Sequence, residues 1–298
     1  MTDASQHAAT PSASAAAPSS ARFPVSVMIL TKDEEINIHR CLSGLGFSDD
    51  IVVYDSFSTD KTLEIARSFA NVTVVQRKFD NWAAHQNWGV TNIPFKHPWV
   101  LYVDADEVLD EQLKGEVLSV ADPASPNSAY RMRRKDIFMG RWLKHAQLYP
   151  TWFVRLFRPS KIRYERLVNP VATVEGPIGE LQGHITHYPF SKGTAQWFDR
   201  HNSYSSFEAQ ELLKVVGGAR QPLSKLFGDP NDRRAVLKDI FFRLPLRPQI
   251  KFLYYMIWRR AFLDGKPGLA YARMQAIYEA MISIKAMELR AKSEGIQL

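Results

Sequence analysis

The sequence predicts an α/β fold in which a mostly parallel sheet is flanked by helices. In the first 128 residues, four short apolar runs rich in Val, Ile or Leu alternate with segments of helical character. This alternation is typical of parallel strands joined by helical crossovers that cover both faces of a sheet. Polar and acidic residues directly follow three of the four runs, and a basic helical segment closes the chain.

The composition is that of a globular protein with a polar tail. The chain has 298 residues, of which 45% are hydrophobic and 23% charged. Residues 1–22 consist mainly of Ala, Ser, Thr and Pro, so we expect a disordered tail without the features of a secretory signal. Cys41 is the single cysteine, which predicts a reducing, cytoplasmic location. No stretch approaches the ~20 apolar residues that a membrane span needs.

The elements of the first half follow from these patterns in order. Strands are predicted at residues 25–30, 51–54, 72–75 and 99–103, and helices at 34–45, 61–69 and 83–90. Asp60 directly precedes the second of these helices and is its expected N-cap.

The pattern changes after about residue 129. A strand with a basic face is expected at 130–135 and another strand at 152–157, whereas residues 165–190 are interrupted by Gly and Pro. Three helices are then predicted, at 195–216, 234–262 and 268–292. The last of them has one apolar stripe at alternating spacings of four and three residues.

The polar residues at the strand ends are the candidate site. Ligands of open α/β sheets bind beyond the carboxyl ends of the strands, where this chain has Thr31, Glu34, Asp55, Asp104 and Asp106. Asp104-Ala-Asp106 is a DxD motif, and two such carboxylates can share Mn²⁺ or Mg²⁺ with phosphate oxygens. The alternative is a solvated acidic loop, but the position after a buried strand favours the metal.

Two of these side chains have alternative roles. Asp55 could accept a hydrogen bond from the N3–H of a uracil ring, or it could be an ordinary turn residue. Glu34 could line a nucleoside pocket, or lie in the first turn of its helix, where negative charge is favourable. No Gly-x-Gly-x-x-Gly follows the first strand, which argues against a dinucleotide enzyme, and there is no P-loop.

Taken together, these segments resemble a known family. Residues 25–35, 51–60 and 99–107 resemble the nucleotide-binding half of family-2 glycosyltransferases with the GT-A fold. Later motifs resemble the lipopolysaccharide-core β-1,4-glucosyltransferase subgroup and its capsule and exopolysaccharide relatives. These are Phe138–Trp142, His145, Tyr149–Pro150, Arg155–Arg158, Gly176–Pro177, Gly183, His187–Tyr188 and Asp264–Leu269. The likeness extends over residues 24–290.

The resemblance implies a division of the chain and a reaction. Residues 23–232 would be the GT-A catalytic domain, with a nucleotide-binding half at 23–128 and an acceptor half at 129–232. The expected reaction is metal-dependent, inverting transfer of a sugar from a nucleotide sugar, with UDP favoured, to a glycan or lipid-linked glycan of the cell envelope.

The resemblance also implies roles for single residues. Asp104 and Asp106 would bind the metal, and Asp106 is also a candidate catalytic residue. Arg155 and Arg158 would reach phosphates or the acceptor; the alternative is that they pair with neighbouring acids. The expected donor-binding set is Thr31, Glu34, Asp55, Gln86, Asp104, Arg155 and Arg158.

Two departures from the family pattern affect the mechanism. Relatives have Gln-Arg-Asn where this chain has His85-Gln86-Asn87, so the positive charge expected near the diphosphate is missing. Relatives also have His-Glu in place of Asn169-Pro170, which removes an expected general base. We favour Glu165 as that base, although it could instead pair with an adjacent Arg. The other candidates are Glu107, Asp136 and Glu175.

The C-terminal residues 233–298 form a basic amphipathic segment. They contain 13 Lys or Arg and 5 Asp or Glu, and Tyr254, Tyr255 and Trp258 are typical of a helix in a membrane interface. We therefore expect peripheral contact with the inner membrane surface; the alternative is packing on the catalytic domain or on a second subunit.

Three other functions are weighed against this one. A nucleic-acid-binding role would use the basic segment, but the chain has no nucleic-acid-binding motif, so no nucleic-acid partner is expected. The runner-up among enzymes transfers the sugar to a polyprenyl phosphate. The two departures would also suit a catalytically inactive assembly partner.

Overall fold

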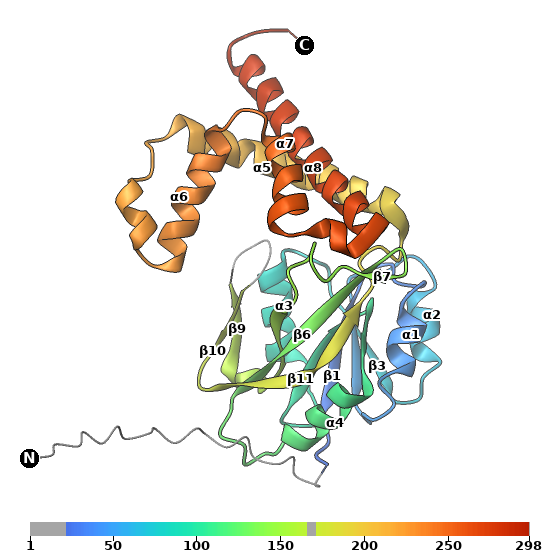
Figure 1. Cartoon of the computed structure of the whole chain (residues 1–298). Helices are drawn as coiled ribbons and strands as arrows, with labels where there is room; N and C mark the ends of the chain where they lie inside the picture. Colours follow the sequence, from blue (N-terminus) through green and yellow to red (C-terminus); the bar gives the residue numbers. More distant parts are fainter. Residues whose placement is uncertain (1–21, 166–170, 298) are drawn as a thin grey trace, which may run out of the picture.

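The computed structural model describes residues 22–165 and 171–297. Nearly all of the predicted tail, and the Asn169-Pro170 pair, lie outside the described residues. Figure 1 shows two layers, an α/β layer built around a sheet and a helical layer formed by α5 to α8 above it.

The first half of the sheet is parallel, as predicted. The strands are β1 (Ser26–Thr31), β2 (Ile51–Asp55), β3 (Val72–Gln76) and β4 (Val100–Asp104), in the order β3-β2-β1-β4. In this register Thr31 lies opposite Asp55, and Leu30 lies opposite Asp104. The polar residues at the three strand ends therefore meet at one edge of the sheet.

Helices α1 (Ile38–Ser43), α2 (Thr62–Arg67) and α3 (Trp82–Asn92) connect these strands. The first is shorter than the predicted 34–45. The backbone N–H groups of Asp33 and Glu34 donate to Ser58 Oγ and Thr62 Oγ1, at 2.8 and 2.7 Å. These side chains hold the residues before α1 against the following loop, so the helix begins only at Ile38.

The second half of the sheet contains antiparallel pairs. Its elements are β5 (Glu107–Leu109), α4 (Glu111–Val120), β6 (Ala129–Phe138), β7 (Arg141–Trp142), β8 (Thr151–Phe157), η1 (Pro159–Lys161), β9 (Ile162–Glu165), β10 (Val171–Val174) and β11 (Ile178–His187). The sheet continues from β4 in the order β8-β6-β11-β5, and β9 pairs with β10 separately. The strands predicted at 130–135 and 152–157 are confirmed as β6 and β8, whereas α4, β5, β7, β9, β10 and β11 were not predicted.

Helix α4 packs closely on β11. Asp110 caps this helix by accepting from Leu113 N at 2.8 Å, as side-chain oxygens at helix N-termini commonly do. A Cβ atom at Gly183 would lie 2.5 Å from the backbone of Leu113. Glycine is therefore required at this position, and it allows β11 to enter the sheet beneath α4.

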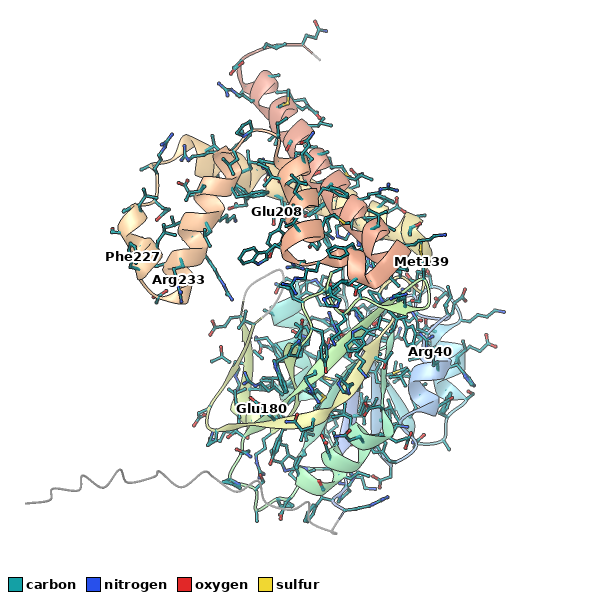
Figure 2. The ribbon with its side chains drawn as sticks, viewed as in Figure 1. Arg40, Met139, Glu180, Glu208, Phe227 and Arg233 are labelled. Atoms are coloured by element: carbon teal, nitrogen blue, oxygen red, sulfur yellow. The ribbon has the colours of Figure 1, made fainter. Side chains whose placement is uncertain are left out.

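The helical layer consists of α5 (Gly193–Gly217), η2 (Leu223–Phe227), α6 (Pro230–Arg243), α7 (Arg247–Leu253), a π-helical turn η3 (Tyr254–Trp258), η4 (Ala261–Asp264) and α8 (Gly265–Ser293). Helices α5 and α8 confirm the predictions at 195–216 and 268–292. The α5 and α7 helices both pack on α8. Phe227 and Arg233 lie on an arm formed by η2 and α6 that stands away from α8 (Figure 2).

The single helix predicted at 234–262 is wrong. It is divided into α6 and a second segment, in which α7 continues directly into η3. The break occurs because Pro245 disfavours helical geometry at the preceding residue, and Leu246 adopts a left-handed conformation with φ 54°. Pro248 then lies in the first turn of α7, where proline is tolerated. The boundary proposed between residues 232 and 233 falls inside α6, and the division into domains stays a prediction.

The two layers are joined by hydrogen bonds near η4. The buried Asp264 carboxylate accepts from the backbone N–H groups of His145 and Ala146, at 3.0 and 2.8 Å. Arg259 donates to the carbonyl of Ala146 at 2.7 Å. Across the described ranges, no helix combines the length and apolarity needed to cross a membrane.

Candidate active site

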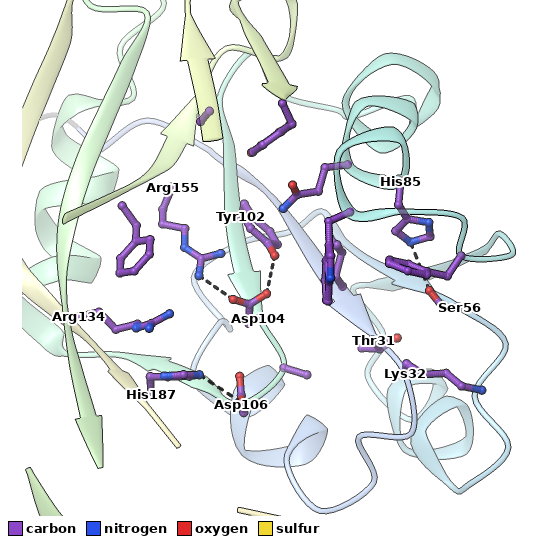
Figure 3. A pocket seen from close by; sticks show the side chains of 18 of the residues that line it. Thr31, Lys32, Ser56, His85, Tyr102, Asp104, Asp106, Arg134, Arg155 and His187 are labelled. Carbon is purple, nitrogen blue, oxygen red and sulfur yellow. Dashed lines mark hydrogen bonds and ion pairs between the residues drawn. The ribbon is translucent and has the colours of Figure 1, made fainter. Parts of the chain in front are cut away.

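A cavity of about 930 Å³ lies at the carboxyl ends of β1 and β4. One wall comes from the strand ends and α3, and the opposite wall from β8, β10 and α5. Figure 3 shows the polar side chains that converge on it. Its polar and aromatic lining includes Thr31, Lys32, Glu34, Ser56, Phe79, Trp82, His85, Gln86, Tyr102, Asp104, Asp106, Arg134, Trp152, Phe153, Arg155, Tyr164, His187, Arg200 and Tyr204.

The predicted acidic pair is at this cavity, and both carboxylates are held by neighbours. Asp104 Oδ2 accepts from Arg155 Nη2 at 2.6 Å, and Asp104 Oδ1 accepts from the Tyr102 hydroxyl at 2.5 Å (Figure 3). Asp106 Oδ2 lies 3.3 Å from His187 Nε2. Burial raises the pKa of Asp104, but Arg155 and the Tyr102 hydroxyl outweigh it and hold that pKa below its ordinary value.

A network of alternating charges continues behind the pair. Arg155 also donates to the fully buried Glu107 at 2.8 Å. Arg134 lies 3.7 Å from Glu107 and 3.1 Å from Asp136. Because buried charges are stable only when they are paired, this network explains how so many ionised groups can lie beneath the cavity.

His187 joins this network to the acidic pair. Its Nδ1 lies 2.5 Å from Asp136 Oδ1, while its Nε2 faces Asp106. Burial lowers the pKa of His187, but hydrogen bonds to Asp106 and Asp136 outweigh it and raise that pKa to about 9. The ring is therefore an imidazolium at neutral pH and contributes one positive charge beside Asp106.

Asp55 lies behind the cavity wall. Its carboxylate is fully buried and accepts from Thr31 Oγ1 at 2.9 Å and from Gln76 Nε2 at 3.1 Å. It also accepts from the backbone N–H of Ser58 at 2.9 Å and from the Ser58 hydroxyl. Asp55 thus stabilises the turn after β2, as expected of an ordinary turn residue, and Thr31 connects it to the cavity. A role in binding the base stays a prediction.

Helix α3 presents a neutral surface to the cavity. Burial lowers the pKa of His85 to about 4, so the ring is uncharged at neutral pH. It stacks on Tyr54 with ring centroids 4.2 Å apart, and its Nε2 lies 3.3 Å from Ser56 Oγ (Figure 3). Within residues 22–165 and 171–297, Gln86 Oε1 is buried without a hydrogen-bond partner.

Glu34 lines the same side of the cavity and is already paired. It lies 2.6 Å from Lys192 Nζ and accepts from Asn37 Nδ2 at 2.8 Å. Burial raises its pKa above the ordinary value despite these two partners. The Lys192 contact links the residues that precede α1 to the residues that precede α5.

The donor role predicted for Arg158 is not supported, because its side chain is not at the cavity. Its guanidinium lies 4.5 Å from the Trp99 ring and donates to the carbonyl of Pro123 at 2.8 Å. Strand β8 runs antiparallel to β4, with Val100 opposite Phe157. This direction places Arg155 near the carboxyl end of β4 and Arg158 near its amino end.

The four candidate bases lie in three different settings. Glu165 ends β9 and is exposed; it does not line the cavity, although Tyr164 beside it does. Glu175 is exposed and lies 2.9 Å from Lys161. Glu107 and Asp136 are buried in the charge network. Catalysis by Glu165 therefore stays a prediction.

Several cavity residues were not identified from the sequence. Tyr102 holds Asp104, and Arg134 neutralises Glu107. His187, which holds Asp106, was named from the sequence only as part of a family motif. Arg200 and Tyr204 reach the cavity from α5, four residues apart on one helix face. No local pattern marked Arg134, Arg200 or Tyr204, because they reach the site from elements that are distant in the sequence. Tyr102 lies two positions before Asp104 on the same strand, so strand alternation could have identified it.

The side chains available as metal ligands at the cavity limit the kind of metal site that can form there. In the described part of the chain, no three His, Cys, Asp or Glu side chains form a metal-binding group. Asp104 and Asp106 supply hard oxygen ligands that suit Mn²⁺ or Mg²⁺. They fit a cation that obtains its other ligands from phosphate oxygens and water, and they do not form a complete protein cage.

The profile of Glycosyl transferase family 2 matches residues 26–177, about half of the chain, including β1 to β4 and Asp104, Asp106 and Arg155. The chain belongs to glycosyl transferase family 2. The cavity thus lies mainly within the matched domain of this family 2 glycosyltransferase, and its fold is of the GT-A type, as the sequence predicted. The α5 residues that line it lie beyond the match.

Curated relatives resemble this family 2 glycosyltransferase over most of its length. It is 24% identical over 265 residues to the lipopolysaccharide core biosynthesis glycosyltransferase LpsC of Rhizobium meliloti, covering 86% of this chain and 91% of that protein. It is 24% identical over 287 residues to the glycosyltransferase RT0209 of Rickettsia typhi, covering 91% of this chain and 89% of that protein.

A solved structure aligns over most of the chain at a lower sequence identity than the two relatives. The crystal structure of TarS 1–349 of S. aureus with UDP-GlcNAc aligns with a TM-score of 0.42 at 14% identity, covering 92% of this chain and 93% of that chain.

Proposed function

We propose that this family 2 glycosyltransferase transfers a sugar, with inversion, from a UDP-sugar to a glycan acceptor of the cell envelope. The observation that supports the proposal best is the Asp104 and Asp106 pair, held at the end of β4 in a cavity large enough for a nucleotide sugar. The likeness to LpsC, which is named for lipopolysaccharide core biosynthesis, supports an envelope glycan as the acceptor. The choice of UDP rests on the sequence resemblance and on Asp55.

The wall formed by β1 and α3 suits the nucleoside. Thr31, Ser56 and Gln86 line it, and the unpaired Gln86 Oε1 could accept a hydrogen bond from the base. Phe79 and Trp82 pack edge to face with centroids 5.2 Å apart and remain partly exposed. They offer an apolar surface for a planar ring.

The diphosphate needs positive charge, and we infer that Arg200 supplies it. Among the residues that the structure describes, four other cations line the cavity and have carboxylate partners: Lys32 with Asp33, Arg134 and Arg155 with Glu107, and His187 with Asp106. Among the described residues, Arg200 has no carboxylate within ion-pair distance, and it donates only to the carbonyl of Pro189, at 3.5 Å. Arg200 would thus replace the charge that is missing from α3.

Asp104 and Asp106 would hold the divalent cation, Mn²⁺ or Mg²⁺. When bound, this cation would stabilise the negative charge that develops on the leaving nucleoside diphosphate. Arg155 and Tyr102 fix the Asp104 carboxylate in position, and His187 orients Asp106. These positioning contacts mean that the acidic pair is preorganised before the donor binds.

An inverting displacement also needs a base within hydrogen-bond reach of the acceptor hydroxyl. We propose Glu165 for this role because it follows Tyr164, which lines the cavity. Strand alternation places neighbouring side chains on opposite faces, so the backbone at the end of β9 must rearrange to bring Glu165 to the acceptor. A Glu165→Gln protein should lose transfer activity but keep donor hydrolysis; full transfer activity would exclude this base.

The test of the main proposal is slow donor hydrolysis. UDP-, GDP-, dTDP- and CMP-sugars are compared with Mn²⁺, Mg²⁺ or EDTA, for wild type, Asp106→Ala and the control Glu64→Gln, which changes an exposed carboxylate on α2 that does not line the cavity. We expect release of UDP alone, dependent on metal, lost in Asp106→Ala and kept in the control.

The alternatives give different results in the same system. If calorimetry detects no binding of any of the four nucleotide sugars to the protein, the result would indicate an inactive assembly partner. Transfer to a polyprenyl phosphate in preference to a truncated lipopolysaccharide would support the runner-up acceptor.

A further inference from the structure

The continuous helix made of α7 and η3 has two apolar faces. One face packs on α8: Phe252, Tyr255 and Met256 join a buried cluster with Tyr271, and Arg247 forms an ion pair with Glu279. The opposite face would normally be polar because it is turned to solvent. Here it consists of Leu246, Leu253, Tyr254, Ile257 and Trp258, which are 68%, 51%, 39%, 69% and 79% exposed.

The next turn enlarges this surface. Phe262 and Leu263 of η4 are also exposed. Seven large apolar side chains are therefore exposed within residues 246–263; we call them the 246–263 patch. Isolated exposed apolar residues are ordinary, but a contiguous group of this size in a soluble protein marks an interaction surface.

The charge around the 246–263 patch identifies the partner. Residues 239–279 contain seven Lys or Arg and three carboxylates. Asp239 and Glu279 pair with Arg243 and Arg247, and the buried Asp264 accepts two backbone hydrogen bonds. Lys251, Arg260 and Lys266 have no carboxylate within ion-pair distance in the described ranges. The electrostatic potential over the 246–263 patch is therefore positive, and the partner that binds this patch should be anionic.

Other occupants fit this chemistry less well. A second copy of the chain would bring the same uncompensated positive charge against itself. Residues 1–21 contain no aromatic, Leu, Ile or Val residue that could cover an apolar surface. A nucleic acid would have little use for Leu246, Leu253, Ile257 and Leu263. Aromatic and aliphatic side chains flanked by Lys and Arg are instead typical of the boundary between lipid headgroups and acyl chains.

We propose that the 246–263 patch docks on an anionic lipid surface. Trp258, Ile257 and Phe262 enter the interface, and Lys251, Arg260 and Lys266 contact the headgroups. Helix α5, which packs on α8, also supplies Arg200 and Tyr204 to the cavity wall. Docking would therefore bring the acceptor side of the cavity close to the membrane, where a lipid-linked acceptor is anchored.

The test is flotation of the full chain with vesicles of equimolar phosphatidylcholine and phosphatidylglycerol at low and high salt. We expect wild type to bind at low salt, with affinity falling about fivefold for each interacting basic residue removed. An Ile257→Asp, Trp258→Asp double variant should bind at least tenfold more weakly. The control Ile36→Asp, at another exposed apolar position, should bind as wild type does. Circular dichroism checks that each variant is folded.

Three results would overturn the proposal. They are no binding of wild type to the anionic vesicles, equal binding to pure phosphatidylcholine, and a wild-type dimer in light scattering that the double variant converts to a monomer. The last result would assign the patch to a second copy of the chain. Donor hydrolysis without vesicles is measured on the same proteins, so failure of membrane docking is separated from failure of the proposed activity.

Discussion

Arg155 is the side chain on which the charge network beneath the cavity depends most. It is 4% exposed and donates to Asp104 at 2.6 Å and to Glu107 at 2.8 Å. Replacing it with Met keeps the apolar contacts of the side chain but leaves two carboxylates without their main cation. Removing one partner of a buried ion pair costs about 3 to 5 kcal/mol. Arg134, 3.7 Å from Glu107, offsets part of this loss, so we expect about 3 kcal/mol.

The measurement is the free energy of unfolding in urea at pH 7. A double variant, Arg155→Met with Glu107→Gln, should recover at least 1 kcal/mol of that loss, because the isolated buried charge is removed as well. The control Arg163→Met changes an exposed arginine and should alter stability by less than about 0.5 kcal/mol. A loss below about 1 kcal/mol for Arg155→Met, or no recovery in the double variant, would refute the reasoning.

Three further predictions follow from single residues. Arg200→Ala should raise the KM for the donor at least tenfold with a smaller effect on kcat, and Arg200→Lys should restore part of the loss; steady-state kinetics with an unchanged KM would contradict diphosphate binding. His85 has a folded-state pKa of about 4, so its folded state binds fewer protons than the unfolded chain. The stability of wild type relative to His85→Gln should therefore be fully present above pH 6.5 and fall by about 1 to 3 kcal/mol as the pH approaches 4, measured by denaturation at both ends of this range. Gly183→Ala places a Cβ 2.5 Å from the Leu113 backbone and should cost about 2 kcal/mol or more, whereas Gly46→Ala meets no atom within 4 Å; equal unfolding free energies of the two variants would argue against tight packing of α4 on β11.

Most of the first half of the fold was predictable because β1, β2 and β4 are buried on both faces, whereas the edge strand β3 is only partly buried. Continuous apolar runs such as residues 27–30 and 51–54 are typical of strands in a parallel sheet that is covered on both faces. Strands β10 and β11 lack such runs, since many of their side chains are exposed. Their place depends on pairing with β9 and β6, which no local pattern encodes. The break between α6 and α7 was encoded, because Pro245 and Pro248 stand at it.

The acidic pair and its position at the end of β4 could be predicted from the sequence alone. An apolar strand followed at once by Asp104 and Asp106 places both carboxylates at the edge of the sheet, because strand ends are local features. The partners of these carboxylates depend on how distant strands pair in the folded protein. Arg155 and Asp104 are 51 positions apart, as are His187 and Asp136, and strand direction and register selected Arg155 and excluded Arg158. Local periodicity gives no information about such contacts, because they form only when distant strands pair.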